Sequence, residues 1–186
     1  MARFGPGVGV EQIDARQAGV WQPFDHVERV AHVQADIRQP AVADMAERAD
    51  TDIDVAGFRA AWDAMTDTHQ FNTLVRKMKM NRLGAYRIAG APFTRPLSPD
   101  ALALLLEQLA GDGMGSMIFV GNMGCIEIHS GPVHTLKPMG PWLNVLDDRF
   151  NLHLRTDHIA EVWLIEKPTK RGMAISVEAF DEDGAL

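Results

Sequence analysis

The sequence predicts an α+β fold in which an antiparallel β-sheet packs against helices. Apolar residues recur with helical spacing over residues 54–111, and the spacing changes to strand-like alternation after Gly115. Because the helices come first and the strands follow, the pattern differs from the alternation of βαβ units. The strands are therefore expected to pair mainly in antiparallel hairpins.

Residues 1–50 are predicted to form a poorly defined arm or linker. The segment begins with a loose Gly- and Pro-containing stretch and ends in a run rich in alanine and charge. Any helix in this segment would lie between Pro23 and Pro40, because proline bounds a helix at each side. Three valines could line one side of it: Val27, Val30 and Val33.

Helical segments with clear apolar faces follow. Asp54 is a good N-cap residue for the first of them. Its apolar positions are Phe58, Trp62 and Met65, and the same spacing reaches His69. A second stripe consists of Phe71, Leu74, Val75 and Met78.

A further helix is predicted after Ser98, which would act as its N-cap with Pro99 at the first helical position. The run ALALLLEQLA would form its body, and Gly111 is expected to end it. Strands are expected after this point, with a hairpin turn at Asn122-Met123-Gly124 and a second turn at PTKRG. The strand-like runs are SMIFVG, CIEIHSG, FNLHLR, HIAEVWLIEK and MAISVEAF.

The overall composition is that of a folded, cytoplasmic protein. Of the 186 residues, 46% are hydrophobic and 23% are charged, which is unlike a disordered chain. The single cysteine, Cys125, cannot form an intramolecular disulfide and is expected to be a buried, unreactive thiol. No apolar run approaches the roughly 20 residues that span a bilayer, and the N-terminal residues do not resemble a signal peptide. We therefore expect no membrane partner.

The net charge limits the ligands that the chain can bind. Eighteen Lys and Arg residues against 25 Asp and Glu residues give a formal charge of −7. This balance argues against a nucleic-acid partner, which requires a basic face. The sequence also lacks a G-x-S-x-G elbow, a Walker loop and a dinucleotide-binding glycine motif. Any anionic ligand must then bind at a local basic cluster.

One such cluster lies just after His69. Four basic residues without an intervening acid fall within seven positions: Arg76, Lys77, Lys79 and Arg82. They could bind an anion such as the propionates of haem, or they could simply be a solvated helix end that favours cations. His69 has two interpretations as well. It could be a hydrogen-bonded core histidine, or an axial ligand that a helix presents to haem iron from an apolar face.

Two other histidines, His129 and His153, lie on the more polar faces of predicted strands and could be neighbours. A surface pair is the expected arrangement. A metal site is the alternative, although no carboxylate or cysteine completes the set at ligand spacing.

Four longer segments carry a family resemblance: TDTHQFNTLVRKMKMNRLGAYRIAG, VGNMGCIEIHSGPV, GPWLNVLDDRFNLHLRTDHIAEVWLIEKPT and SVEAFDEDG. They resemble the HemS/ChuS family of cytoplasmic haem-utilisation proteins, also called haemin-degrading factors. The resemblance covers about residues 52–184. It implies that residues 51–186 form a haem-binding half-domain, equivalent to the C-terminal half of the family's duplicated architecture.

The resemblance also implies which residues bind haem. His69 occupies the place of the axial ligand in the motif Thr66-Asp67-Thr68-His69-Gln70-Phe71. Arg82 and, in the turn EKPT, Lys167 match basic residues near the propionates. The family's N-terminal half, which supplies distal groups, has no counterpart here, and the family's last strand and basic tail are missing too. A homodimer is expected to restore the two-half arrangement and to cover an open sheet edge.

Three functions follow from these observations. The first is a haem-binding protein for storage or for transfer to a haem-accepting protein. The second is an oxygenase-like enzyme that degrades haem. The third is a degenerate half-domain that folds without binding haem.

Overall fold

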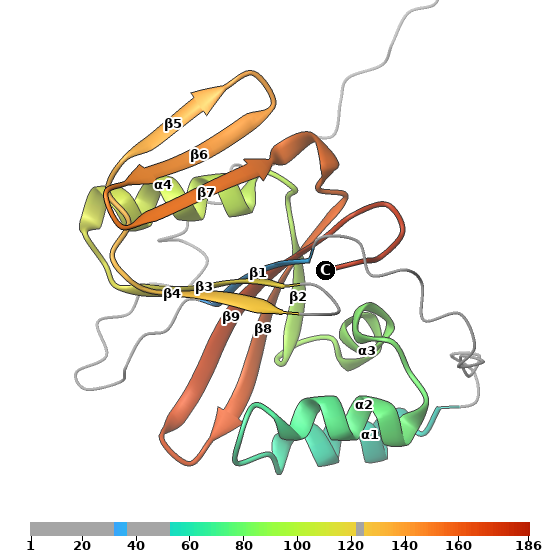
Figure 1. Ribbon diagram of the computed structural model, residues 1–186. Helices are drawn as coiled ribbons and strands as arrows, with labels where there is room; N and C mark the ends of the chain where they lie inside the picture. Colours follow the sequence, from blue (N-terminus) through green and yellow to red (C-terminus); the bar gives the residue numbers. More distant parts are fainter. Residues whose placement is uncertain (1–31, 37–52, 122–124) are drawn as a thin grey trace, which may run out of the picture.

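The computed structural model describes residues 32–36, 53–121 and 125–186. Its centre is a six-stranded sheet with α1, α2 and α3 on one face, and with α4 and a small three-stranded sheet on the other (Figure 1). No helix within these ranges is long and apolar enough to cross a membrane. The predicted α+β class is confirmed.

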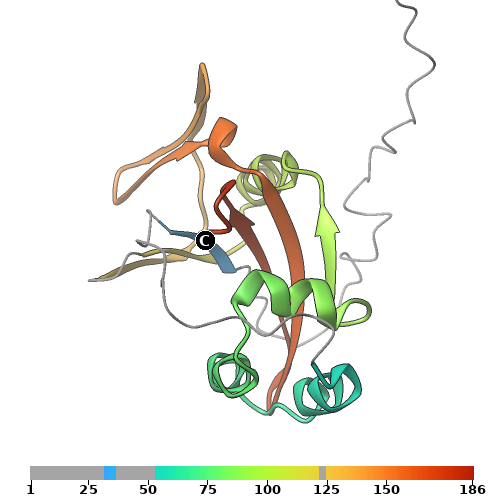
Figure 2. The same ribbon diagram turned by 90° about the vertical axis from the view of Figure 1, so that its right-hand side faces the viewer.

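Three short helices cover one face of the large sheet. Asp54 caps the first as predicted, since its side chain accepts a hydrogen bond from the backbone N–H of Gly57 at 2.9 Å. The second helix buries Phe71 and Val75, in agreement with the predicted stripe. The helices are α1 (Val55–Asp63), α2 (Gln70–Met78) and α3 (Arg82–Ala89). Figure 2 shows α1 and α2 nearly end-on, with α3 lying across them.

Helix α4 (Ala101–Asp112) lies on the opposite face and starts later than predicted. Pro99 belongs to a turn rather than to the first helical turn, and the Ala101 N–H donates to the Ser98 carbonyl at 2.9 Å. The helix continues through Gly111 and ends where Gly113 adopts a left-handed conformation with φ +61°. Both predicted ends are wrong by two residues. At the C-terminal end the reason is that Gly113, and not Gly111, adopts the left-handed conformation that stops the helix.

The large sheet has the strand order β2-β8-β9-β1-β3-β4. Its strands are β1 (His32–Asp36), β2 (Thr94–Leu97), β3 (Ser116–Gly121), β4 (Ile126–Gly131), β8 (Glu161–Thr169) and β9 (Gly172–Phe180). Strands β3 and β4 form the predicted antiparallel pair, as do β8 and β9. The turn at residues 122–124 lies outside the described residues.

Strand β1 is a correction to the interpretation of Val33 as a position on one side of a helix between Pro23 and Pro40. Val33 lies in this strand, which pairs in parallel with both β3 and β9. Backbone hydrogen bonds to a strand on each side stabilise the extended conformation, and a short isolated helix has no comparable source of stability. Val27, Val30 and the other residues of the predicted arm, 1–31 and 37–50, lie outside the described residues.

The small sheet packs its apolar face onto α4. It comprises β5 (Leu136–Met139), β6 (Trp142–Asp147) and β7 (Phe150–Arg155), all antiparallel. Leu143, Val145 and Leu154 are buried against Leu102 and Leu106 of the helix. The alternation predicted for FNLHLR is confirmed, because its leucines point to this core.

An aromatic core fixes α1, α2 and α3 on the large sheet. Trp62 is fully buried, and its indole N–H donates to the Glu166 carbonyl of β8 at 2.9 Å. Its ring centroid lies 5.0 Å from that of Phe71 and 5.8 Å from that of Phe58. Burying rings of this size contributes a few kcal/mol each, so this core holds the three helices on the sheet.

Candidate functional site

His69 immediately precedes α2, and its side chain is 90% exposed. The apolar stripe predicted to include it stops at Met65, because α1 ends at Asp63 and a turn separates the two helices. The interpretation of His69 as a buried core histidine is therefore wrong. The imidazole stands in solvent, where a ligand can reach it.

Asp67 fixes the orientation of this imidazole. Its Oδ1 accepts a hydrogen bond from the His69 backbone N–H at 2.8 Å and lies 2.8 Å from the ring Nδ1. Hydrogen bonds from the backbone and ring of His69 lower the pKa of Asp67. An ionised carboxylate can only accept, so Nδ1 donates a proton in this hydrogen bond, and a neutral ring in this orientation has its lone pair at Nε2. A histidine needs this tautomer to bind iron through Nε2.

The two predicted basic residues meet at a buried carboxylate, Glu178 of β9. Its Oε2 accepts from Arg82 Nη1 at 2.9 Å and from the Tyr86 hydroxyl at 2.6 Å. Its Oε1 accepts from Lys167 Nζ at 3.2 Å and from the Ser176 hydroxyl at 3.3 Å. We call these five residues the Glu178 cluster.

The cluster holds more positive than negative charge. Burial by itself would raise the pKa of Glu178, but the Lys167 ammonium and the Arg82 guanidinium lower it to about 2. Burial raises the pKa of Tyr86, so its hydroxyl stays protonated and donates. Burial lowers the pKa of Lys167, and the charge of Glu178 opposes this effect. Two cations beside one carboxylate leave an excess of one positive charge.

The sequence suggested that Lys167 lies in a turn, but it does not. It is part of β8, paired with Ala174, and only 7% of its surface is exposed. Its ammonium lies 4.7 Å from the centroid of the Phe71 ring and 5.8 Å from that of Tyr86. The hairpin turn follows later, between Thr169 and Gly172, because the strand pairing extends to these two residues. Arg82 is the more accessible cation, with 27% of its side chain exposed.

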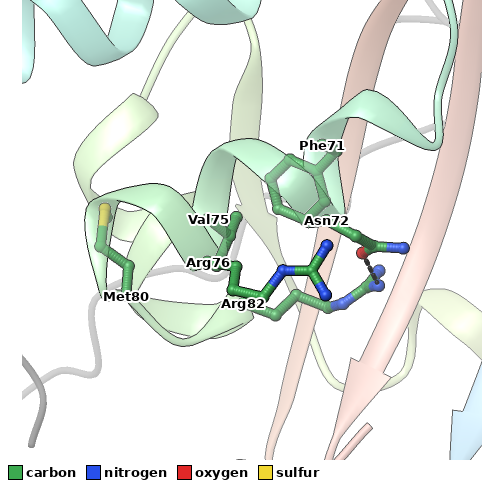
Figure 3. Close-up of a pocket in the computed structure, with 6 residues that line it drawn as sticks. All are labelled: Phe71, Asn72, Val75, Arg76, Met80 and Arg82. Atoms are coloured by element: carbon green, nitrogen blue, oxygen red, sulfur yellow. Dashed lines mark hydrogen bonds between the residues drawn. The ribbon is translucent and has the colours of Figure 1, made fainter. Parts of the chain in front are cut away.

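A hollow of about 150 Å³ lies beside Arg82, between α2 and α3. Asn72 Oδ1 accepts a hydrogen bond from Arg82 Nη2 at 3.0 Å at its edge (Figure 3). The six lining residues are Phe71, Asn72, Val75, Arg76, Met80 and Arg82. Pockets that enclose a drug-sized ligand span about 300–1,000 Å³. The hollow can therefore take one edge of a porphyrin but cannot enclose the whole ring.

These residues fit haem better than they fit a bare metal ion. No group of three His, Cys, Asp or Glu side chains in the described ranges could hold an ion. Haem supplies four of the iron ligands itself, so the protein needs to add only one imidazole. His69 offers that nitrogen, and the apolar lining with its nearby arginines suits the edge of a ring that carries carboxylates.

Two other predictions for polar residues are wrong. His129 of β4 stacks on the ring of Phe150, with centroids 4.0 Å apart, whereas His153 of β7 hydrogen bonds through Nδ1 to Asn144 at 2.6 Å. The two histidines belong to different sheets and do not form a pair. Cys125 is exposed rather than buried, because it directly precedes the edge strand β4.

Comparison with known proteins identifies the family. Residues 79–186 match the family model described as the haemin-degrading HemS.ChuX domain. The chain belongs to this family. The matched range includes Arg82, Lys167 and Glu178, whereas Asp67 and His69 precede it. The predicted resemblance to haem-utilisation proteins is thereby confirmed.

A curated relative is similar to this HemS.ChuX-family chain in sequence. The hemin transport protein HmuS of Yersinia pestis is 40% identical over 131 residues, which are 70% of this chain and 38% of the relative. The chain thus spans well under half the length of this relative.

Two solved structures give the same picture. The holo form of PhuS, a heme-binding protein from Pseudomonas aeruginosa, matches with a TM-score of 0.74 and 46% identity over 81% of this chain and 42% of PhuS. ChuS, a heme degrading enzyme of Escherichia coli O157:H7, matches with a TM-score of 0.70 and 39% identity over 74% of this chain and 41% of ChuS.

Sequence reasoning missed three residues that organise this HemS.ChuX-family site. Asp67 belongs to the same motif as His69, but nothing in the sequence indicates that it orients the imidazole. Glu178 carried a detectable signal, because an acid within the apolar strand SVEAF is expected to have a buried partner. Tyr86 gave no local signal that separates it from an ordinary core aromatic residue.

Proposed function

We propose that the chain binds haem through Nε2 of His69 as an axial ligand, and handles it for storage or for transfer to a haem-accepting protein. The observation that carries the proposal is the exposed imidazole, whose Nδ1 lies 2.8 Å from Asp67. This hydrogen bond leaves Nε2 for iron. Support also comes from the similarity to a hemin transport protein and to a heme-binding protein.

In this proposal the propionates lie towards Arg82. Its guanidinium combines partial exposure with the excess charge of the Glu178 cluster. Lys167 is buried and paired with Glu178, so it adds positive charge beneath the site without contacting a propionate directly. The ring of Phe71 lies beneath both cations and gives the edge of the porphyrin an apolar surface.

A surface site suits a carrier. Haem can reach an exposed imidazole without displacing any core side chain, and it can leave by the same route. Reversible transfer needs this balance, whereas a fully enclosed ligand must wait for the protein to open. A cytoplasmic setting stays a prediction from the sequence.

The test is a haem titration followed by the Soret band. His69→Ala is compared with His158→Ala, which removes another exposed histidine in the 3-10 turn Thr156–His158. We expect the first change to shift the Soret maximum and to weaken binding at least about tenfold, and the second to do neither. An unchanged spectrum and affinity in His69→Ala would reject the axial assignment. A folded wild-type chain without haem affinity would support the degenerate half-domain instead.

Haem degradation is the second candidate, and the similarity to the heme degrading enzyme ChuS favours it. The test supplies the haem complex with ascorbate and oxygen in the presence of catalase, which removes free peroxide. Biliverdin- or verdohaem-like absorption bands would support degradation. Haem that persists under these conditions would support carriage alone.

We also propose that a second copy of the chain covers haem on the side away from His69. The His69 side chain is 90% exposed, and the second copy would shield a ring bound to it from solvent. Light scattering with and without haem tests this, and a doubling of mass on adding haem is expected. A monomer that holds haem with the same affinity at all protein concentrations would contradict it.

A further inference from the structure

We infer that Arg76, together with Asn72, forms a second carboxylate-binding position in the hollow between α2 and α3. This inference rests on the proposed haem binding, since it names the residue that receives the propionate not held by Arg82. It adds a residue from the last turn of α2 to a site otherwise built from α3 and the large sheet.

The first argument is the position of Arg76 on the helix. His69, Asn72 and Arg76 follow a spacing of three and then four residues, and His69 itself has helical backbone angles. Residues with this spacing lie on one side of a helix. Seven residues at a rise of about 1.5 Å place Arg76 roughly 10 Å along α2 from His69. A ligand bound to His69 that lies along α2 therefore reaches Arg76.

The second argument is a comparison of the side-chain hydrogen bonds of Arg76 and Arg82. Arg82 is already bound to Glu178, Tyr86 and Asn72. The side chain of Arg76, by contrast, forms no hydrogen bond or ion pair with any residue in the described part of the chain. Both line the hollow, and Figure 3 shows the two side chains extending in the same direction, towards Asn72. Two neighbouring guanidinium groups repel each other unless an anion lies between them.

The third argument is the charge count. The Glu178 cluster offers one excess positive charge, which balances one carboxylate. A ligand with two carboxylates needs a second cation, and Arg76 is the cation that lines the same hollow. The apolar lining of Phe71, Val75 and Met80 then contacts the body of the ligand. The hollow therefore favours a flat apolar molecule that carries two carboxylates on one edge.

A simpler explanation for Arg76 is that the C-terminal end of a helix favours cations. Lys77 shares that location in the last turn of α2 but does not line the hollow. It therefore provides a matched control, with the same charge and the same helix end.

The experiment uses iron-free protoporphyrin IX, so that the bond to His69 plays no part. Fluorescence titrations compare the wild type, Arg76→Gln and Lys77→Gln, each with the diacid and with its dimethyl ester. We expect Arg76→Gln to weaken binding of the diacid about tenfold and to leave the ester unchanged. Lys77→Gln should leave both affinities as in the wild type.

Three results would overturn the inference: equal affinities in the two variants, an equal loss for diacid and ester in Arg76→Gln, or a wild type that does not prefer the diacid. The proposed function is judged separately, by the haem titration with His69→Ala. A selective loss in Arg76→Gln beside an unaffected His69→Ala would keep this inference and reject the axial ligand.

Discussion

The His69–Asp67 pair and the Glu178 cluster are both polar, yet their environments are opposite. The ring of His69 is 90% exposed and the side chain of Asp67 is 61% exposed, so water screens their interaction. Glu178 is 2% exposed and accepts hydrogen bonds from four side chains. The exposed pair can exchange partners at little cost, whereas the cluster cannot lose Glu178 without leaving the Lys167 ammonium buried and without a counter-ion.

This difference separates ligand binding from stability within one site. An exposed imidazole contributes little to folding and is available for iron. A satisfied buried cluster holds Arg82 at the edge of the hollow and determines the charge there. Variants of the Glu178 cluster should therefore change the free energy of unfolding, whereas variants of the His69–Asp67 pair should change haem affinity. The expected effect on stability decreases from Glu178 to Asp67.

The largest effect is expected from Glu178→Ala. Removing this carboxylate leaves the Lys167 ammonium buried without its counter-ion. Breaking a buried ion pair in this way costs about 3–5 kcal/mol of unfolding free energy. Urea unfolding followed by circular dichroism measures the loss, and Glu107→Ala, on the exposed side of α4, is the control. Equal unfolding curves for the two variants would contradict the proposed importance of the cluster.

The stability of the protein at low pH should also depend on Glu178, and the isosteric variant Glu178→Gln provides the comparison. The pKa of Glu178 is about 2 in the folded protein, against an ordinary value of 4.5. A lowered pKa stabilises the folded state above the ordinary value, and this contribution is lost as the pH falls towards 2. We expect the wild type to lose on the order of 3 kcal/mol relative to Glu178→Gln over that window. Parallel pH profiles of unfolding would show that Glu178 does not titrate in this way.

A smaller loss is expected from Tyr86→Phe. The change keeps the fully buried ring and removes only the hydroxyl that donates to Glu178 at 2.6 Å. A hydrogen bond to a charged group contributes about 2 kcal/mol, so unfolding should become easier by roughly this amount. Thermal and urea unfolding measure it. A stability equal to that of the wild type would mean that the remaining donors compensate for the lost hydroxyl.

Asp67→Ala should leave the unfolding curve unchanged, because the pair is exposed. Haem affinity, in contrast, should fall about tenfold, since the variant loses the carboxylate that orients the ligating imidazole. Asp63→Ala, at the exposed end of α1, is the matched control. A variant that lost stability without losing haem affinity would reverse the distinction between the two regions.

Local signals predicted those parts of the fold that depend on neighbouring residues. The capping role of Asp54, the buried side of α2 and the β3–β4 hairpin each follow from interactions within a few positions of the chain. The same local reasoning failed at helix ends. Gly111 and Gly113 look equivalent in the sequence, and only the backbone conformation shows which one ends α4.

Long-range partners explain the remaining errors. Residues 32–36 look unremarkable as a sequence, yet they form a strand because β3 and β9 lie on each side of it. His129 and His153 seemed suited to pair, but the strands that carry them belong to different sheets. The exposure of Cys125 follows from the edge position of β4, which the strand order alone determines.

The sequence by itself determined the α+β class and the family, and it indicated His69 and the basic run after it as candidate binding residues. These features depend on residue type, spacing and motif, which are properties of the linear chain. Only the tertiary structure decided that His69 is exposed and that Arg82 and Lys167 meet at Glu178. Arg82 and Glu178 are 96 positions apart, and no spacing rule connects such residues. The aromatic core brings them together, because it packs Tyr86 of α3 against Phe180 of β9.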